Sequence, residues 1–135
     1  MIERIFILEN PKIEGIQEKK KEIEELLKSC GKTVEKEFKN PDMILTMGGD
    51  GTILKAVGLL RNEKTLIYGI RYGKVGFLTN SSENIEEKIK NLIAGKYKVC
   101  ERMLLELNYN NVYEKVLNDF LFFRTTIRIV NFEIY

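Results

Sequence analysis

The chain has 135 residues, of which 44% are hydrophobic and 31% are charged, and this composition excludes an intrinsically disordered protein. A net charge of +2, with basic and acidic residues interleaved, is too small to predict binding to nucleic acid or to an anionic membrane. The sequence contains no histidine, which excludes Ser-His-Asp and Cys-His nucleophile systems and histidine-based zinc sites.

The first part of the sequence alternates strand-like and helix-like segments. Compact apolar runs, or an alternation of apolar and charged residues, predict strands over residues 4–9, 33–38, 42–47 and 65–70. Apolar residues at helical spacing predict helices over residues 16–30, 51–61 and 85–94. Because such alternation is typical of a parallel sheet covered on both faces, we predict an α/β fold, with a Rossmann-like, mostly parallel sheet and flanking helices.

Two of the predicted helices carry signals at their ends. Gly31 and Gly95 follow the first and the third helix, where glycine commonly ends a helix. Asn84 precedes the third helix, and Glu87 stands three residues later. This spacing predicts a capping box in which Asn84 is the N-cap of the third helix.

From Tyr97 onward the sequence has strand-like runs without helical spacing. The runs cover residues 98–109, 112–123 and 126–135, and Asn110-Asn111 predicts a hairpin turn between the first two. The change predicts an α/β domain over residues 1–96 and the incomplete start of an all-β domain over residues 97–135. Three strands would leave an unpaired apolar edge, so we expect the protein to form a homo-oligomer.

A glycine-rich loop, MGGDGT (residues 47–52), joins the third predicted strand to the second predicted helix. Ligands bind at the carboxyl ends of parallel strands, where glycines allow close backbone approach and helix N-terminal amides suit phosphate. Asp50 would repel a phosphate unless Mg²⁺ or an incoming hydroxyl intervenes, which favours a role as a base or metal partner. The alternative is a glycine turn in which Asp50 is the N-cap of the helix.

A second glycine-bearing loop, GIRYGKVGFLTN (residues 69–80), follows the next predicted strand. Its glycines indicate a tight backbone beside a ligand, with Arg71 and Lys74 as candidate phosphate contacts. The alternative is a connecting loop with exposed basic residues, in which Phe77 is anchored in the core.

Asn118 and Asp119 interrupt an apolar run in the predicted all-β region. Polar groups in such a run are costly to bury unless they are paired or face a ligand. The two residues are therefore either ligand contacts or part of a bulge or turn.

The remaining features concern the compartment. Cys30 and Cys100 lack metal-ligand spacing, and we expect two reduced thiols. No apolar run approaches the roughly 20 residues that a membrane-spanning helix needs, and the N-terminus lacks a signal-peptide pattern. We therefore expect a cytoplasmic protein that binds neither membranes nor nucleic acid.

The segments GGDGT, GIRYGKVGFLT, ERMLLEL and LND, in this order over residues 42–120, resemble the NAD kinase family. The resemblance implies transfer of a phosphoryl group from ATP to the 2′-hydroxyl of the adenosine ribose of NAD, giving NADP, with Mg²⁺ or another divalent cation. It implies that Asp50 activates this hydroxyl, close to the metal ion, and that residues 97–135 begin a β-sandwich NAD-binding domain. The implied ligand-binding residues are Gly48, Gly49, Gly51, Thr52, Arg71, Lys74, Phe77, Asn118 and Asp119.

Two features depart from the pattern of that family. Arg71 stands where the family usually has Asn, and family members are usually more than twice as long. Their C-terminal domain carries a further segment that helps to bind NAD, so we expect a truncated form or a site completed by another copy. The alternatives are a catalytically inactive nucleotide-binding fragment or assembly module, and a lipid or sugar kinase with a similar glycine loop. ATP, another nucleoside triphosphate and polyphosphate all stay open as phosphoryl donors.

Overall fold

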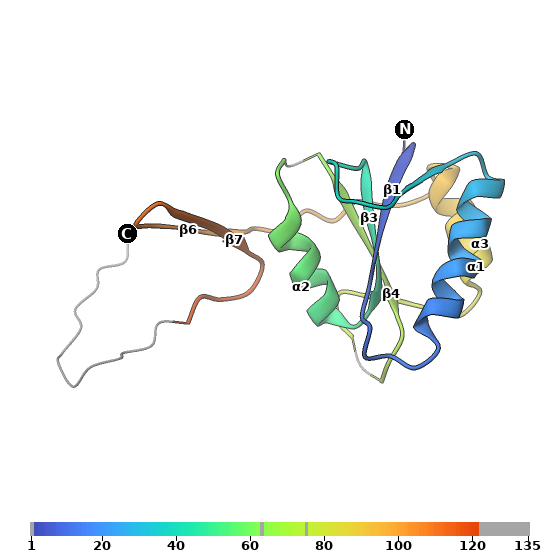
Figure 1. Cartoon of the computed structure of the whole chain (residues 1–135), viewed down its shortest axis with the longest axis horizontal. Helices are drawn as coiled ribbons and strands as arrows, with labels where there is room; N and C mark the ends of the chain where they lie inside the picture. Colours follow the sequence, from blue (N-terminus) through green and yellow to red (C-terminus); the bar gives the residue numbers. More distant parts are fainter. Residues whose placement is uncertain (1, 63, 75, 122–135) are drawn as a thin grey trace.

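The computed structural model describes residues 2–62, 64–74 and 76–121. The strands are β1 (Arg4–Glu9), β2 (Thr33–Glu35), β3 (Met43–Gly48), β4 (Leu66–Arg71), β5 (Asn80–Ser81), β6 (Leu105–Tyr109) and β7 (Val112–Val116), and the helices are α1 (Ile16–Ser29), α2 (Asp50–Leu59) and α3 (Ile85–Ile93). In this part of the chain, five parallel strands form a sheet in the order β2-β1-β3-β4-β5, and β6 pairs with β7 in antiparallel orientation. Figure 1 shows α1 and α3 on one face of the sheet and α2 on the other. The predicted α/β fold is therefore confirmed.

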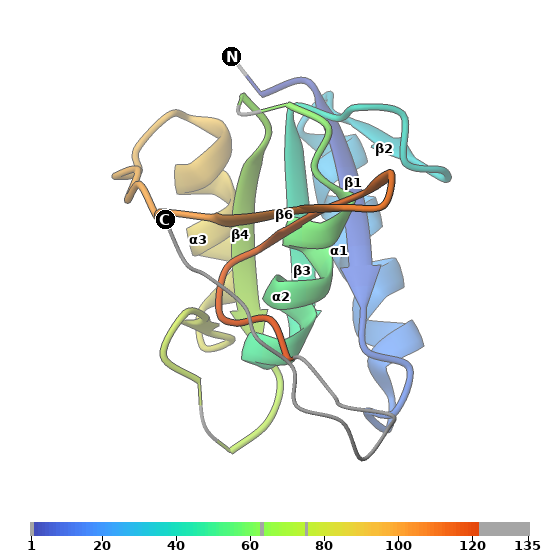
Figure 2. The same cartoon turned by 90° about the vertical axis from the view of Figure 1, so that its left-hand side faces the viewer.

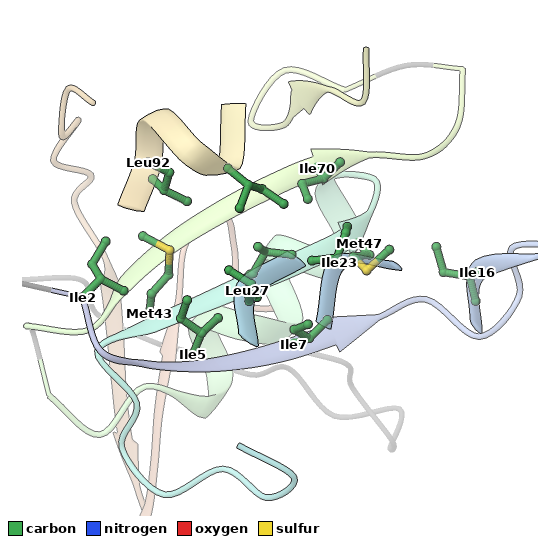
Figure 3. Close-up of a cluster of buried hydrophobic side chains, with 12 residues drawn as sticks. Ile2, Ile5, Ile7, Ile16, Ile23, Leu27, Met43, Met47, Ile70 and Leu92 are labelled. Atoms are coloured by element: carbon green, nitrogen blue, oxygen red, sulfur yellow. The ribbon is translucent and has the colours of Figure 1, made fainter. Parts of the chain in front are cut away.

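The main core lies between the sheet and helices α1 and α3 (Figure 3). Every residue of β3 is buried, because this central strand is covered on both faces. Its side chains alternate: Met43, Leu45 and Met47 join the cluster with α1 and α3, whereas Ile44 does not belong to that cluster. The strand that carries the GGDGT loop at its end is thus the most completely buried strand of the sheet.

The predicted strands of the sheet agree closely with the observed ones. β1 covers the predicted residues 4–9, while β3 and β4 each begin and end one residue later than predicted. The strand predicted over residues 33–38 is shorter, since β2 is an edge strand whose register with β1 ends at Glu35. The prediction missed β5, because a strand of two residues has no period to recognise.

The start of α3 differs from the predicted capping box. Asn84 has a left-handed backbone, with φ of 51°, and its side chain makes no capping hydrogen bond. A capping side chain needs an extended backbone at the N-cap to reach the amides of the first turn. The prediction that Asn84 and Glu87 form a capping box is therefore wrong. Gly31 and Gly95 have positive φ, as expected for glycines that end helices.

The hairpin β6–β7 forms through the predicted turn. Asn110 and Asn111 have φ of 47° and 65°, and a two-residue type I′ turn requires positive φ at both positions. The hairpin extends from the sheet on the α2 side, and β7 contacts α2 (Figures 1 and 2). Its strands are shorter than predicted, because their mutual register runs only from Leu105 and Val116 to the turn. The strand predicted over residues 126–135 lies outside the described residues, and the boundary near residue 96 stays a prediction.

Two observations bear on the compartment. Cys30 and Cys100 are free thiols within the described chain, as predicted. Across residues 2–62, 64–74 and 76–121, no helix has both the length and the apolar character that membrane crossing demands.

Candidate functional site

The two glycine loops meet at the carboxyl edge of the sheet. β3 and β4 are neighbouring parallel strands, with Met47 opposite Ile70 and Gly48 opposite Arg71. The loops that follow these strands therefore start at the same level of the sheet. The amide of Tyr72 donates a hydrogen bond of 3.0 Å to the Gly48 carbonyl, which ties the start of the second loop to the first.

The GGDGT loop packs against a buried residue at Gly48 and is exposed to solvent at Gly51. A Cβ atom on Gly48 would lie 2.2 Å from Oγ1 of Thr52, and Thr52 itself is buried. Only glycine fits at position 48, because the buried threonine leaves no space for a side chain. Gly49 is the N-cap of α2, and Gly51 is exposed in the first turn of this helix. The backbone around Asp50 is thus accessible to a ligand at the amino end of α2.

Asp50 joins the two loops through its carboxylate. Its Oδ2 accepts a hydrogen bond from the Phe77 amide at 2.8 Å. Its Oδ1 accepts hydrogen bonds from the Leu78 amide at 3.0 Å and the Thr79 hydroxyl at 3.5 Å. The interpretation of Asp50 as the N-cap of α2 is wrong, since Gly49 holds that position and α2 has no side-chain capping bond.

These contacts favour the ionised form of Asp50. The Phe77 amide is the largest cause that lowers the pKa of the carboxyl; burial opposes it, and the Leu78 amide, the Thr79 hydroxyl and the Arg71 charge lower the pKa further. The net pKa lies below the usual aspartate value. At neutral pH Asp50 is therefore a carboxylate that accepts hydrogen bonds and can receive a proton.

Arg71 contacts the second loop and also borders a surface cavity. Its Nη1 donates a hydrogen bond of 3.4 Å to the Gly76 carbonyl, and its charge acts on Asp50. A guanidinium beside hydroxyl groups suits the oxygens of a phosphate. The cavity has a volume of about 470 Å³ and is lined by Ile13, Arg71, Tyr72, Gly73, Ser81, Ser82 and Glu83.

Phe77 and Lys74 are exposed on the second loop. The Phe77 side chain is 91% exposed, so the interpretation of Phe77 as a core anchor is wrong. The loop instead turns its amide toward Asp50 and leaves the ring in water. An exposed ring next to a carboxylate is available to stack on a flat ligand such as a nucleotide base.

Asn118 and Asp119 follow β7 and do not lie at the meeting point of the two loops. Both residues are exposed, and Asn118 lies in a bend beyond the end of the strand. Figure 1 shows the segment after β7 on the outer side of α2, away from the sheet. Neither residue is buried, so no unpaired polar group has to be explained here, and their role as ligand contacts stays a prediction.

The residues at the site fit a metal ion only together with a bound nucleotide. Among the described residues, no group of three or more cysteine, aspartate or glutamate side chains is placed to hold a metal ion. Both oxygens of Asp50 already accept hydrogen bonds. Mg²⁺ commonly keeps several waters and is bound by one or two carboxylates plus substrate phosphates. The donor set fits a Mg²⁺ ion that phosphates hold near Asp50, rather than a site built by protein alone.

The sequence interpretation missed Thr79 and most of the residues that line the cavity, which are Ile13, Tyr72, Ser81, Ser82 and Glu83. Thr79 directly follows the Gly-Phe-Leu segment of the second loop, but its contact with Asp50 spans 29 residues of sequence. The available signal was the position of this loop at the end of a parallel strand beside β3, since such loops share one edge.

Comparisons with known proteins show which proteins this chain is similar to. Residues 5–97 match the family described as the ATP-NAD kinase N-terminal domain. The chain is 42% identical over 79 residues to the NAD kinase of Methanothermobacter thermautotrophicus, covering 58% of this chain and 28% of that protein. It also resembles the crystal structure of an NAD kinase from Archaeoglobus fulgidus in complex with ATP, with a TM-score of 0.55 and 35% identity over 68% of this chain and 37% of that chain.

A third similarity concerns the fold alone. The crystal structure of yeast NADH kinase complexed with NADH matches with a TM-score of 0.71 and 20% identity, over 87% of this chain and 44% of that chain. The chain thus spans less than half the length of these three proteins, at 28%, 37% and 44%.

Proposed function

The chain belongs to the ATP-NAD kinase family, and from this membership we propose that it is the N-terminal part of an NAD kinase. The proposed reaction transfers the γ-phosphoryl group of ATP to the 2′-hydroxyl of the adenosine ribose of NAD, giving NADP and ADP. The meeting of the two glycine loops at Asp50 supports this proposal most directly. A carboxylate, accessible amides and a guanidinium at one edge are the groups that phosphoryl transfer to a hydroxyl needs.

In the proposed reaction, the hydroxyl oxygen bonds to the γ-phosphorus while the bond from that phosphorus to the leaving ADP oxygen breaks. Asp50 accepts the hydroxyl proton, and ADP leaves with the electron pair. A divalent cation such as Mg²⁺ would be held by the ATP phosphates, with Asp50 as the neighbouring carboxylate, and it would supply positive charge that offsets the charge of the phosphates.

The other residues at the edge have binding roles in this proposal. The phosphates approach the backbone at the start of α2, where Gly48, Gly49 and Gly51 have no side chains. Thr52 packs against Gly48. The basic side chains bind phosphate oxygens, and the exposed aromatic ring contacts the nucleotide. These side chains are Arg71, Lys74 and Phe77.

Asn118 and Asp119 are proposed to contact the hydroxyls of NAD. Because both residues lie outside the two glycine loops, this role needs their segment to lie over these loops when NAD is bound. Asn118→Ala is therefore expected to weaken NAD binding and leave ATP binding unchanged. Asp50→Asn differs from it, because this change removes the proposed catalytic group.

The proposal is tested by measuring NADP formation from NAD, ATP and Mg²⁺. Two proteins are compared: the purified chain, and the chain fused to the remaining C-terminal residues of the Methanothermobacter thermautotrophicus NAD kinase. We expect the fusion protein to form NADP, because the fusion supplies the part of the relatives that this chain does not span. If neither protein forms NADP although both bind ATP, the proposed kinase function is wrong, and the alternative of an inactive nucleotide-binding module takes its place.

Parallel assays separate the other candidates. Diacylglycerol and fructose 6-phosphate as acceptors test the lipid and sugar kinases, and NADH in place of NAD tests the acceptor preference. Another nucleoside triphosphate or polyphosphate in place of ATP tests the donor. We propose ATP, because the similar Archaeoglobus fulgidus protein was crystallised with it.

We also propose a cytoplasmic homo-oligomer. Two free thiols suit a reducing compartment. Tyr109, Val112 and Tyr113 are 65%, 50% and 55% exposed on the hairpin, which gives an apolar surface suited to contact with a second copy. Sedimentation of the chain is expected to show a dimer or a larger oligomer, and Val112→Lys is expected to shift it toward the monomer.

A further inference from the structure

We infer that the turn Gly76–Thr79 is a positioning element for Asp50, and that it leaves Oδ2 as the oxygen that takes the acceptor hydroxyl. The identity of that hydroxyl rests on the proposed function. The positioning itself rests on contacts between described residues that are 27 to 29 positions apart in the sequence.

The Asp50 carboxylate accepts three hydrogen bonds from the turn Gly76–Thr79. An ionised carboxylate has about four acceptor positions, two on each oxygen. At Oδ1, the Leu78 amide and the Thr79 hydroxyl occupy two positions. At Oδ2, the Phe77 amide occupies one. One position therefore remains, on Oδ2, and a ligand hydroxyl that reaches Asp50 donates its hydrogen bond there.

Gly76 is the residue that allows the turn to close on Asp50. A Cβ atom on Gly76 would lie 2.1 Å from Oγ1 of Thr79 and 3.1 Å from Oδ1 of Asp50. The first distance is far too short for any pair of nonbonded atoms, so an alanine at position 76 forces Thr79 or the turn to move. Gly76 is needed here for space, and it is a positioning residue that does not itself touch the hydroxyl.

The hydrogen bonds from the turn also change the chemistry of the Asp50 carboxylate. Because the turn donates hydrogen bonds to the carboxylate, its charge is partly neutralised and it binds a proton weakly. Such a group orients the hydroxyl in the ground state and takes its proton late, when the bond to phosphorus is largely formed. The turn thus makes Asp50 an orienting acceptor rather than a strong base.

The inference is tested by following the Asp50 carboxyl carbon by NMR during acid titration, from about pH 6 to about pH 2.5. Gly76→Ala is compared with Gly58→Ala, where a Cβ atom meets nothing within 4 Å. We expect a wild-type midpoint below the usual aspartate value and a rise of about half a pH unit in Gly76→Ala. Gly58→Ala is expected to keep the wild-type midpoint. Equal midpoints in all three proteins would overturn the inference.

Thr79 gives a second test if Gly76→Ala does not fold. Thr79→Val removes the hydroxyl and keeps the shape of the side chain, whereas Thr79→Ser keeps the hydroxyl. We expect Thr79→Val to raise the Asp50 midpoint less than Gly76→Ala, because the 3.5 Å hydroxyl contact is the longest of the three. Thr79→Ser is expected to restore the wild-type midpoint. A midpoint that is the same in the valine and serine variants contradicts a role for Thr79.

Kinetics separate the inference from the proposed function. In the fusion protein described above, Gly76→Ala is expected to lower kcat about tenfold while KM for ATP stays within about twofold. If the fusion protein forms no NADP but the midpoints shift as expected, the proposed function fails and the positioning stands. If NADP forms but the midpoints do not move, the positioning fails and the proposed function stands.

Discussion

Two aspartates at opposite ends of β3 each accept hydrogen bonds from two backbone amides. Asp42 precedes the strand, and its Oδ2 accepts hydrogen bonds from the amides of Glu3 at 2.9 Å and Arg4 at 2.8 Å. Asp50 follows the strand and accepts hydrogen bonds from two amides of the second glycine loop. In both cases backbone amides are the largest cause that lowers the pKa of the carboxyl. A low pKa therefore does not distinguish the two.

The surroundings of the two carboxylates differ. Asp42 also lies 3.6 Å from the guanidinium of Arg4 and fastens the beginning of β1 to that of β3. Asp50 lies at the carboxyl edge, beside glycines without side chains, an exposed Phe77 ring and the Arg71 cavity. The difference teaches that a perturbed carboxylate marks a candidate site only where the backbone around it is open to a ligand.

The largest expected effect is on phosphoryl transfer. In the NADP-forming fusion protein, Asp50→Asn is expected to lower kcat by about 10²- to 10⁴-fold, the usual contribution of a group that accepts a proton from the reacting hydroxyl. Asp42→Asn is the matched control, because the same change is made at the other end of the same strand. It is expected to leave kcat within about twofold. Similar losses of kcat in both variants would contradict a catalytic role that belongs to Asp50 and not to Asp42.

The next effect concerns the stability of the fold, through the packing of Gly48 against Thr52. Gly48→Ala is expected to destabilise the fold by about 1–3 kcal/mol, because the added Cβ would lie 2.2 Å from Oγ1 of the buried Thr52. Gly51→Ala is the control, since a Cβ there meets nothing within 4 Å and alanine favours the helix by about 0.5–1 kcal/mol. Urea unfolding followed by circular dichroism measures both. A stable Gly48→Ala protein would show that the loop can relax.

The sequence predicted the strands and glycine loops of the carboxyl edge, but not the contacts between them. The apolar runs that form β1, β3 and β4 predicted the sheet, because buried parallel strands have a strong local signal. The glycine loops predicted a ligand-binding site at the carboxyl edge of the sheet, because their glycines are also recognised directly in the sequence. The contact of Asp50 with the turn Gly76–Thr79 could not be predicted, because it depends on which strands are neighbours. The capping-box prediction failed for a related reason: spacing does not reveal that Asn84 has a left-handed backbone.

A smaller effect is expected for the structural carboxylate. Asp42→Ala leaves two amides of the β1 start without their acceptor, and we expect a loss of about 1–2 kcal/mol in the free energy of unfolding. The value is modest because the Asp42 side chain is 35% exposed, and water screens its charge. Urea unfolding at neutral pH measures the loss. No change would mean that water replaces the carboxylate fully, and Asp42 would then not fasten the two strands.

The smallest effect is a pH dependence shared by the two carboxylates. Each has a folded-state pKa below its unfolded value, so its hydrogen bonds stabilise the fold above about pH 4 and this contribution is lost as the pH falls through the folded-state pKa. Asp42→Asn and Asp50→Asn cannot titrate at these positions. Each variant is therefore expected to lose less unfolding free energy than the wild type between about pH 5 and about pH 2.5. Urea unfolding across this range tests the expectation, and curves parallel to the wild type would contradict the lowered pKa at that position.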